Sequence, residues 1–335
     1  MDPVRVLRQI ALHLERAGEP TYRVRAFRKA AAVIGDLPSG ELEQRVDAGT
    51  LTALSGIGKT TAAVITDAVR GREPAYLTEV VAKGAPGLPD GGPLLAALRG
   101  DCHTHSDWSD GGSPIEEMAE AARQLGREYI VLTDHSPRLT VANGLSAERL
   151  RDQLAVVAKL NRELAPFRIL KGIEVDILDD GALDQDPALL DELDVVVASV
   201  HSKLRMPAAE MTRRMLAAVA NPRVNVLGHC TGRLVVGKGR PESLFDAEAV
   251  FTACRDNDVA VEINSRPERL DPPRRLLREA VRIGCRFSID SDAHAPGQLA
   301  WLPYGSARAT ECGVAESDVI NTMSADDLVA WAASR

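Results

Sequence analysis

Apolar residues recur at helical spacing through the first part of the chain. They stand three or four positions apart in four segments, 4–17, 21–36, 41–48 and 60–70, and β-branched residues there show almost no alternation. This pattern predicts a small all-α domain over residues 1–83.

Glycine and proline then interrupt the pattern. Residues 84–93, GAPGLPDGGP, contain four glycines and three prolines in ten positions. Such a composition does not continue a helix or a strand. We therefore expect a linker over residues 84–99, followed by a second domain over residues 100–335.

Short apolar runs alternate with helical stretches in the second part. Ser113 and Pro114 are expected to open one helix, as N-cap and first helical residue, and Ser146 to cap another. Strands rich in valine and isoleucine that are separated by helices are typical of a parallel sheet covered on both faces. Seven such units are enough to close a barrel, so we expect an α/β fold. The seven expected strands are residues 101–106, 129–133, 168–175, 194–200, 223–228, 259–264 and 286–291.

Six of the seven histidines fall at or just beyond the ends of these strands. One histidine in such a place is more often an ordinary polar residue, and His13, on the first helix, keeps that interpretation. In a parallel barrel, however, the carboxyl ends of all strands gather on one face. Six histidines and three carboxylates are therefore expected to meet there. The nine candidate ligands are His103, His105, Asp110, His135, Glu174, His201, His229, Asp292 and His294.

Nine donors exceed what one metal ion needs, since a catalytic zinc takes about three protein ligands and a water. We therefore expect a multinuclear site. Imidazole and carboxylate without thiolate suit Mn, Zn or Fe. Clustered ions of this kind act in displacement at phosphorus, so the expected reaction is hydrolysis of a phosphoester.

Composition narrows the class of protein. The chain is 45% hydrophobic and 26% charged, as in ordinary globular proteins, and its five cysteines form no CxxC pair. We expect buried, reduced thiols rather than a disulfide framework. A charged N-terminal helix and the absence of a long apolar run lead us to expect a cytoplasmic protein without a membrane span.

Charge is divided unevenly along the chain. Residues 1–90 hold 12 basic and 11 acidic side chains, and residues 91–335 hold 28 and 37. The net charge of −8 therefore belongs to the second part. Contacts with a phosphate backbone are expected in the first part.

The motifs around the nine candidate ligands resemble the PHP (polymerase and histidinol phosphatase) superfamily over residues 100–330. The resemblance implies a distorted (β/α)7 barrel that holds two to three divalent metal ions (Mn, Zn or Fe). It assigns one ion to His103, His105, Glu174 and Asp292, the four residues expected to be catalytic. It assigns a second to Glu174, His201 and His229, and a third to Asp110, His135 and His294. The matching motifs are HTH at 103–105, DG at 110–111, TDHS at 133–136, GIEVD at 172–176, SVHS at 199–202, LGH at 227–229 and SDAH at 291–294.

The linking segments are most similar to the PHP domains of bacterial family X DNA polymerases, and the first domain supports this. LSGIGK at 54–59 and YRVRAFRKAAAVI at 22–34 resemble their helix-hairpin-helix DNA-binding domain. A glycine hairpin that opens a helix presents N–H groups to a phosphate. The expected DNA contacts are Gly56, Gly58, Lys59, Arg23, Arg25, Arg28 and Lys29.

Two departures from these polymerases limit the expected activities. Only the linker separates the helical domain from the barrel, so no polymerase palm is present between them and DNA synthesis is not expected. The position that matches the Schiff-base lysine of the family's deoxyribose-phosphate lyase is Val64. Lyase activity is therefore not expected either.

The favoured function is a metal-dependent phosphoesterase that processes DNA 3′ ends, as a 3′-5′ exonuclease or 3′-phosphatase. Its phosphate-binding residues are expected to be Lys203, Arg233 and Arg269, which follow candidate ligands or a strand, although surface solvation would explain each of them equally well. Trp108 would stack on a base or, as we favour, pack against the fold. Two alternatives stay open, a small-molecule phosphatase of the histidinol-phosphate type and a DNA-binding module with a decayed barrel.

Overall fold

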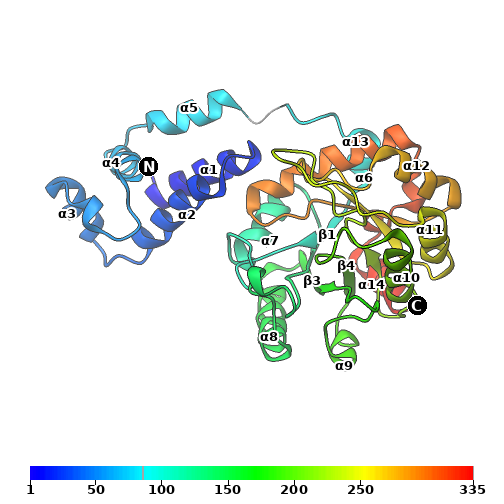
Figure 1. Cartoon of the computed structure of the whole chain (residues 1–335). Coiled ribbons are helices and arrows are strands. Elements are labelled where there is room, and N and C mark those ends of the chain that lie inside the picture. Colours follow the sequence, from blue (N-terminus) through cyan, green and yellow to red (C-terminus); the bar gives the residue numbers. More distant parts are fainter. Residues whose placement is uncertain (85–86, 335) are drawn as a thin grey trace. The chain divides into compact units, whose positions relative to one another are not determined.

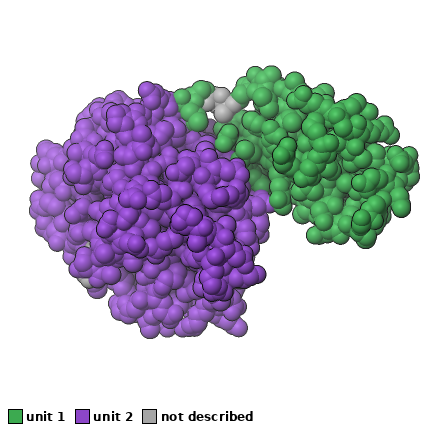
Figure 2. Space-filling view, turned by 180° about the vertical axis from the view of Figure 1, so that it is seen from behind, with its two compact units in different colours: residues 1–88 green, residues 89–335 purple. Residues whose placement is uncertain are grey.

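The computed structural model describes residues 1–84 and 87–334 and divides the chain into two compact units, Met1–Leu88 and Pro89–Arg335 (Figures 1 and 2). Within the range expected to be a linker, residues 85 and 86 lie outside the described residues. Residues 92–97 form a helix there, α6 (Gly92–Ala97). Leu94 and Leu98 anchor this segment in the core of the second unit, which is why it is helical despite its glycines.

The first unit is all-α, as predicted. Val6, Leu7, Ile10 and Leu14 form the apolar stripe of its first helix and lie in the core of the unit. The last helix was not predicted, because its nine residues between a proline and a glycine show only two turns of pattern. The helices are α1 (Pro3–Arg16), α2 (Thr21–Gly35), α3 (Glu41–Ala48), η1 (Leu51–Ala53), α4 (Lys59–Val69) and α5 (Ala75–Lys83).

The second unit is a seven-stranded parallel barrel, which confirms the expected fold class. Each strand pairs in parallel with the next one along the chain. A parallel bridge between Thr104 and Ala293 joins the first strand region to the last, and the N–H of His105 donates to the carbonyl of Ala293 at 2.8 Å. The strands are β1 (Gly100–Thr104), β2 (Tyr129–Leu132), β3 (Arg168–Asp176), β4 (Val195–Ser199), β5 (Val226–Leu227), β6 (Ala260–Asn264) and β7 (Phe287–Asp290).

The fifth strand is shorter than residues 223–228, which the pattern predicted. The side chain of Asn225 accepts the N–H of Val196 at 2.8 Å, so a side chain replaces the strand's own backbone at this step of the ladder. Only Val226 and Leu227 pair as strand residues with both neighbours.

Helices cover the outside of the barrel (Figure 1). Ser146 caps the helix that begins at Ala147, as predicted, since its hydroxyl accepts the N–H of Arg149. The other predicted helix begins at Ile115 rather than at Pro114, and Ser113 does not cap it. The carbonyl of Ser113 accepts the N–H of Asp107 at 2.9 Å. The helices are α7 (Ile115–Gln124), η2 (Thr140–Ala142), α8 (Ala147–Leu164), α9 (Pro187–Leu190), α10 (Ala208–Val219), α11 (Ala247–Asp256), α12 (Arg274–Ile283), η3 (Pro296–Trp301), α13 (Leu302–Cys312), η4 (Glu316–Asp318), η5 (Ile320–Thr322) and α14 (Ala325–Ala333).

The apolar side chains of the strands fill the inside of the barrel and pack against the surrounding helices. The five cysteines are buried and form no disulfide in the described part of the chain, as expected. Trp108 is partly buried and packs against this core, in agreement with the packing interpretation. None of the helices described combines the length and apolarity that crossing a bilayer requires.

Candidate metal centre

The barrel brings the nine candidate ligands together at the carboxyl ends of its strands. His103 lies on β1 and His105 just beyond it, and their ring centroids are 5.1 Å apart. Both rings are fully buried. Asp110 lies in the loop after β1, and the other six candidate ligands lie on or just beyond other strands, as the parallel topology predicts.

Glu174, near the end of β3, occupies the middle of the cluster. Its Oε1 lies 2.9 Å from Nε2 of His229 and 3.2 Å from Nε2 of His201. Its Oε2 lies 2.9 Å from Nδ1 of His135 and 3.3 Å from Nε2 of His103. One buried carboxylate therefore faces four imidazoles, the arrangement expected of a bridging ligand.

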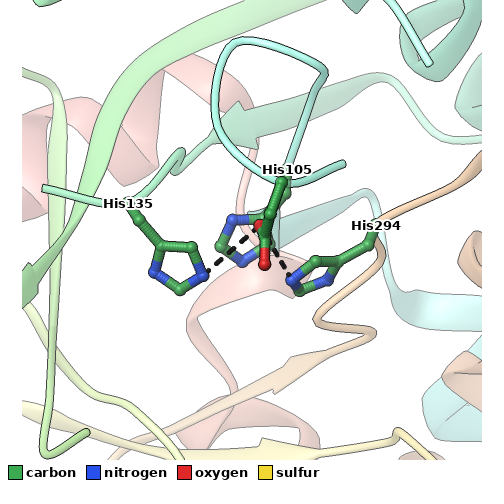
Figure 3. A group of neighbouring side chains, drawn as sticks. His105, His135 and His294 are labelled. Carbon is green, nitrogen blue, oxygen red and sulfur yellow. Dashed lines mark ion pairs between the residues drawn. The ribbon is translucent and has the colours of Figure 1, made fainter. Parts of the chain in front are cut away.

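A second carboxylate, Asp110, faces the outer part of the cluster. Its Oδ1 lies 3.4 Å from Nε2 of His294 and 3.6 Å from Nε2 of His135. Figure 3 shows His105, His135 and His294 converging on one point from three segments of the chain. The rings of His105 and His294 are 4.1 Å apart.

Asp292 completes the set on the β7 side. Its Oδ1 lies 3.5 Å from Nε2 of His105, and its backbone has a φ of 52°, a left-handed conformation that is costly for a residue with a side chain. Strained backbone of this kind persists where the surrounding structure enforces it and is frequent at functional sites.

Donor atoms of three groups of these side chains lie within 4.8 Å of one another. These groups overlap with the three sets implied by the family resemblance, but His105 joins the third set, and His135 takes the place of His229 beside His201. The groups are His105, Asp110, His135 and His294; His103, His105 and Glu174; and His135, Glu174 and His201.

Buried nitrogen and oxygen atoms on seven of the nine side chains lack hydrogen-bond partners among the described residues. Buried polar atoms are rarely left so. A group of unsatisfied acceptors and imidazole nitrogens fits a set of cations, which would satisfy them together. The atoms concerned are Nε2 of His103 and His201, both ring nitrogens of His105, Nδ1 of His135 and His229, Oδ1 of Asp110 and both carboxylate oxygens of Glu174.

Two further carboxylates orient the histidines from behind, and sequence reasoning missed both. Glu262 on β6 lies 2.5 Å from Nδ1 of His103, and Asp176 lies 2.5 Å from Nδ1 of His201. Each carboxylate leaves Nε2 of its histidine directed at the centre, as partners of metal-binding histidines do. Strand alternation places Glu262 on an inward face, which is the signal that could have identified it.

A third buried carboxylate, Asp134, shapes the loop that carries Asp110. It accepts hydrogen bonds from the hydroxyls of Ser106 and Ser109 at 2.5 Å and from the side-chain amide of Gln153 at 2.6 Å. The residue between β2 and His135 therefore fixes the loop after β1.

Burial and neighbouring charges shift the ionisation of the cluster in opposite directions. Burial lowers the pKa of His103, but Glu174 and Glu262 raise it well above its usual value. Burial likewise lowers the pKa of His201, but Glu174 and Asp176 raise it to about 9. Burial and the neighbouring His294 lower the pKa of His105.

Of the three residues predicted to bind phosphate, the structure brings only Arg269 to the centre. Its Nε lies 3.1 Å from Oδ2 of Asp292. Lys203 is exposed and pairs with Asp179 at 2.5 Å. Arg233 donates to the carbonyl of Arg269 at 3.0 Å, so it supports the loop and does not face the ligands.

Arg266 is the arginine that the sequence reasoning missed. Its Nη1 lies 3.1 Å from Nδ1 of His294 and 3.2 Å from the carbonyl oxygen of Asp292. Its guanidinium lies 6.0 Å from the centre of the Trp301 ring, within cation–π range.

These groups line one open pocket of about 450 Å³. Seven of the nine candidate ligands and two arginines contribute to its wall. The lining residues are Asp110, His135, Leu139, Glu174, His201, His229, Leu234, Val236, Gly237, Arg266, Glu268, Arg269, Asp292 and His294.

The basic residues expected to contact DNA divide into two kinds within the first unit. Arg28 pairs with the buried Glu15 at 2.7 Å, and Arg23 lies 2.5 Å from Glu19. Arg23 also donates to the hydroxyl of Tyr76 on α5 at 2.8 Å, so both guanidinium groups are engaged in holding helices together. Arg25, Lys29 and Lys59 are exposed.

The glycine hairpin has the expected form. Gly56 has a φ of 99°, and a Cβ there would lie 2.6 Å from Cε of Lys29, so the lysine stem packs on the hairpin. The N–H of Gly58 donates to Oγ1 of Thr61 at 3.0 Å and begins α4. Val64, in the place of the lyase lysine, is buried in the core of the unit.

Two family models match the chain, a helix-hairpin-helix domain over residues 1–73 and a PHP domain over residues 101–266. A DNA polymerase/3′-5′ exonuclease PolX of Bacillus subtilis (strain 168) is 40% identical over 237 residues, 71% of this chain and 41% of that protein. The chain therefore spans less than half the length of that relative.

Shorter relatives match the barrel along most of their own length. A probable phosphatase of Aliivibrio fischeri (strain MJ11) is 30% identical over 239 residues, which are 66% of this chain and 88% of that protein. Among solved structures, histidinol phosphate phosphatase of Lactococcus lactis, complexed with zinc, L-histidinol and phosphate, is 21% identical with a TM-score of 0.47, covering 64% of this chain and 94% of that one.

Proposed function

The chain belongs to the PHP domain family, and on that premise we propose that it is a metal-dependent phosphoesterase that processes the 3′ ends of DNA. The observation that carries the proposal is the convergence of nine imidazole and carboxylate side chains, seven of which have buried nitrogen or oxygen atoms without partners among the described residues. A site with this donor set suits Mn, Zn or Fe.

Two to three divalent ions would occupy the site. We propose that Glu174 bridges them, with the catalytic set His103, His105 and Asp292 on one side. Ions held there would supply the positive charge that lowers the pKa of a water and stabilises the oxygen that leaves. The remaining ligands of the proposed centre are Asp110, His135, His201, His229 and His294.

The two pocket arginines would orient the phosphate. Nη1 of Arg269 is buried and has no hydrogen-bond partner among the described residues, so it is available to donate to a phosphate oxygen. Arg266 stands beside His294 and would add a second positive charge at the same wall. Arginine forms paired hydrogen bonds with phosphate, which would fix the orientation of the ester.

DNA is the proposed substrate because of the first unit. Its match to the helix-hairpin-helix model and the similarity to the Bacillus polymerase/exonuclease support binding of a duplex. The exposed residues Arg25, Lys29 and Lys59, with Gly56 at the hairpin, would contact phosphates, whereas the N–H of Gly58 is already engaged with Thr61. A small-molecule phosphatase remains the second candidate, since the probable phosphatases match the barrel alone.

The experiment that separates these functions uses the full chain with Mn²⁺ or with chelator. Duplex DNA labelled at a 3′-terminal nucleotide, the same duplex ending in a 3′-phosphate, and histidinol phosphate would each be supplied. We expect cleavage of the DNA substrates, its loss with chelator, and its loss in His103→Ala. Hydrolysis of histidinol phosphate alone would refute the DNA function and establish the second candidate.

A further inference from the structure

The mouth of the pocket carries apolar side chains that the proposed chemistry does not use. Leu139, Leu234 and Val236 line the pocket beside the histidines and arginines. Val236 is 58% exposed, its neighbour Val235 50%, and Val141, in the same loop as Leu139, 92%. Exposed aliphatic side chains gathered beside a site mark a contact surface. We refer to these five residues as the apolar rim.

Backbone hydrogen bonds hold the valine part of the rim in place. Leu234 and Arg240 pair as an antiparallel bridge, and the N–H of Val235 donates to the carbonyl of Glu268 at 2.7 Å. Glu268 lies between the two pocket arginines in the sequence. The position of the valines is therefore tied to the loop that would hold the phosphate.

The leucine part of the rim is braced in a similar way. Asn143, with a φ of 55°, donates from its side chain to the carbonyl of Trp108 at 3.2 Å. Arg149 donates to the carbonyl oxygens of Asn143 and Gly144 at 2.7 and 3.2 Å. The loop that carries Leu139 and Val141 is thus fixed to the helix behind it.

The side chains of the pocket wall determine which ester groups the apolar rim can bind. A phosphate held by the ligands and Arg269 leaves the remainder of the ester at the mouth of the pocket. A cationic alcohol placed there would approach two arginines and aliphatic side chains, which is unfavourable on both counts. A nucleobase presents a flat, weakly polar face that aliphatic side chains contact well.

We infer that the apolar rim binds the nucleobase of the 3′-terminal nucleotide, with Leu234 and Val236, which line the pocket, as specificity-determining residues. This inference rests on the proposed function and adds the group that is recognised beside the scissile phosphate.

The test compares two oligonucleotides that differ only at the 3′ end, one with a normal terminal nucleotide and one with an abasic terminal nucleotide. For the wild-type protein with Mn²⁺ we expect kcat/KM about tenfold higher for the normal end, because the base buries apolar area on the rim. In the double variant Leu234→Ser, Val236→Ser this ratio should fall to about one. Hydrolysis of glycerol phosphate, which has no base, should be unchanged.

The matched control is Leu244→Ser, since Leu244 is 66% exposed but does not line the pocket. This variant should keep the wild-type ratio. A wild-type ratio near one, or a ratio that the double variant leaves unchanged, would overturn the inference while the DNA function stands. A lower sedimentation coefficient of the double variant, with the ratio of the two kcat/KM values unchanged, would also overturn it. That result would identify the rim as a self-association surface. Failure of the wild type to cleave DNA at all would refute the proposed function itself.

Discussion

Single carboxylates behind the ligands determine how well the centre is organised. Glu262 contacts His103 through Nδ1 and also accepts the N–H of His229 at 2.5 Å, so one side chain positions two ligands. Partners of this kind are worth about 10- to 100-fold in metal affinity or activity.

Glu262→Gln should therefore weaken Mn²⁺ binding about 10- to 100-fold, because glutamine is a poorer acceptor and fixes the ring less well. Titration calorimetry would measure the affinity, and excess Mn²⁺ should restore much of the activity. Asp191→Asn is the control, since Asp191 is exposed and forms its ion pair with Arg223, away from the candidate ligands. Unchanged affinity in Glu262→Gln would contradict the positioning role.

The ionisation of His201 gives the metal-free protein a characteristic dependence on pH. Burial opposes the charged ring, but Glu174 and Asp176 raise its pKa to about 9 in the folded chain. The folded value is above the usual value of about 6.5. The protonated ring therefore stabilises the fold fully below about pH 6.5, and this stabilisation is lost as the pH rises through about 9.

With chelator present, the difference in unfolding free energy between wild type and His201→Gln should be largest near pH 6, up to about 3 kcal/mol. Above about pH 9.5 the difference should approach zero. Denaturant titrations at several pH values would measure it. A difference that grows with pH would show that the ring is neutral in the folded state.

Close packing of strands sets the spacing of the ligands at the scale of elements. Gly172 stands in β3 two residues before Glu174, and a Cβ there would lie 2.5 Å from Cγ1 of Val131 and 3.0 Å from the carbonyl oxygen of Val195. The glycine allows β3 to approach both neighbouring strands and so positions the bridging carboxylate.

Gly172→Ala should destabilise the barrel by about 1–3 kcal/mol, because the added methyl forces the strands apart. Gly112→Ala is the matched control, since its added Cβ would have its nearest neighbour at 3.6 Å, an ordinary contact. Thermal unfolding of both variants would measure the effect. Equal melting temperatures would show that the sheet absorbs the methyl without strain.

At the same scale, the sequence determines some features and leaves others open. The hydrophobic pattern identified all seven strands, and parallel topology then predicted that His105 and His294 meet although they stand 189 positions apart. Asp176 and Arg266 were missed, because their roles depend on side-chain directions at a strand end and in a loop, which periodicity does not encode. Lys203 and Arg233 shared with Arg269 a place near the ligands, but only coordinates distinguish a side chain that faces the pocket from one that leaves it.

At the scale of the molecule, the proposed function assigns DNA binding to the first unit and the chemistry to the second. Charge reversal on the hairpin side, Arg25→Glu with Lys59→Glu, should lower cleavage of duplex DNA about tenfold or more, because each lost phosphate contact weakens binding and reduces its salt dependence. Hydrolysis of glycerol phosphate should be unaffected. Rates measured from low to moderate salt would test both statements.

The control for this variant carries the same change of charge elsewhere on the unit. Arg72 and Lys83 are exposed and pair with Asp67 and Glu79. Arg72→Glu with Lys83→Glu should alter DNA cleavage much less. Equal losses in the two double variants would indicate that net charge, and not the hairpin, attracts the DNA.

The bridge between Thr104 and Ala293 has a consequence for how this barrel can be divided. Its two flanks carry His103, His105 and Asp110 on one side and Asp292 and His294 on the other, and the other candidate ligands lie on or just beyond the strands between them. Any fragment that omits one end of the ring therefore omits part of the catalytic group as well. If the barrel were cut in the middle, its two halves would regain activity only by reassembling. A cut after Leu88, at the boundary of the two units, would leave every candidate ligand on one piece.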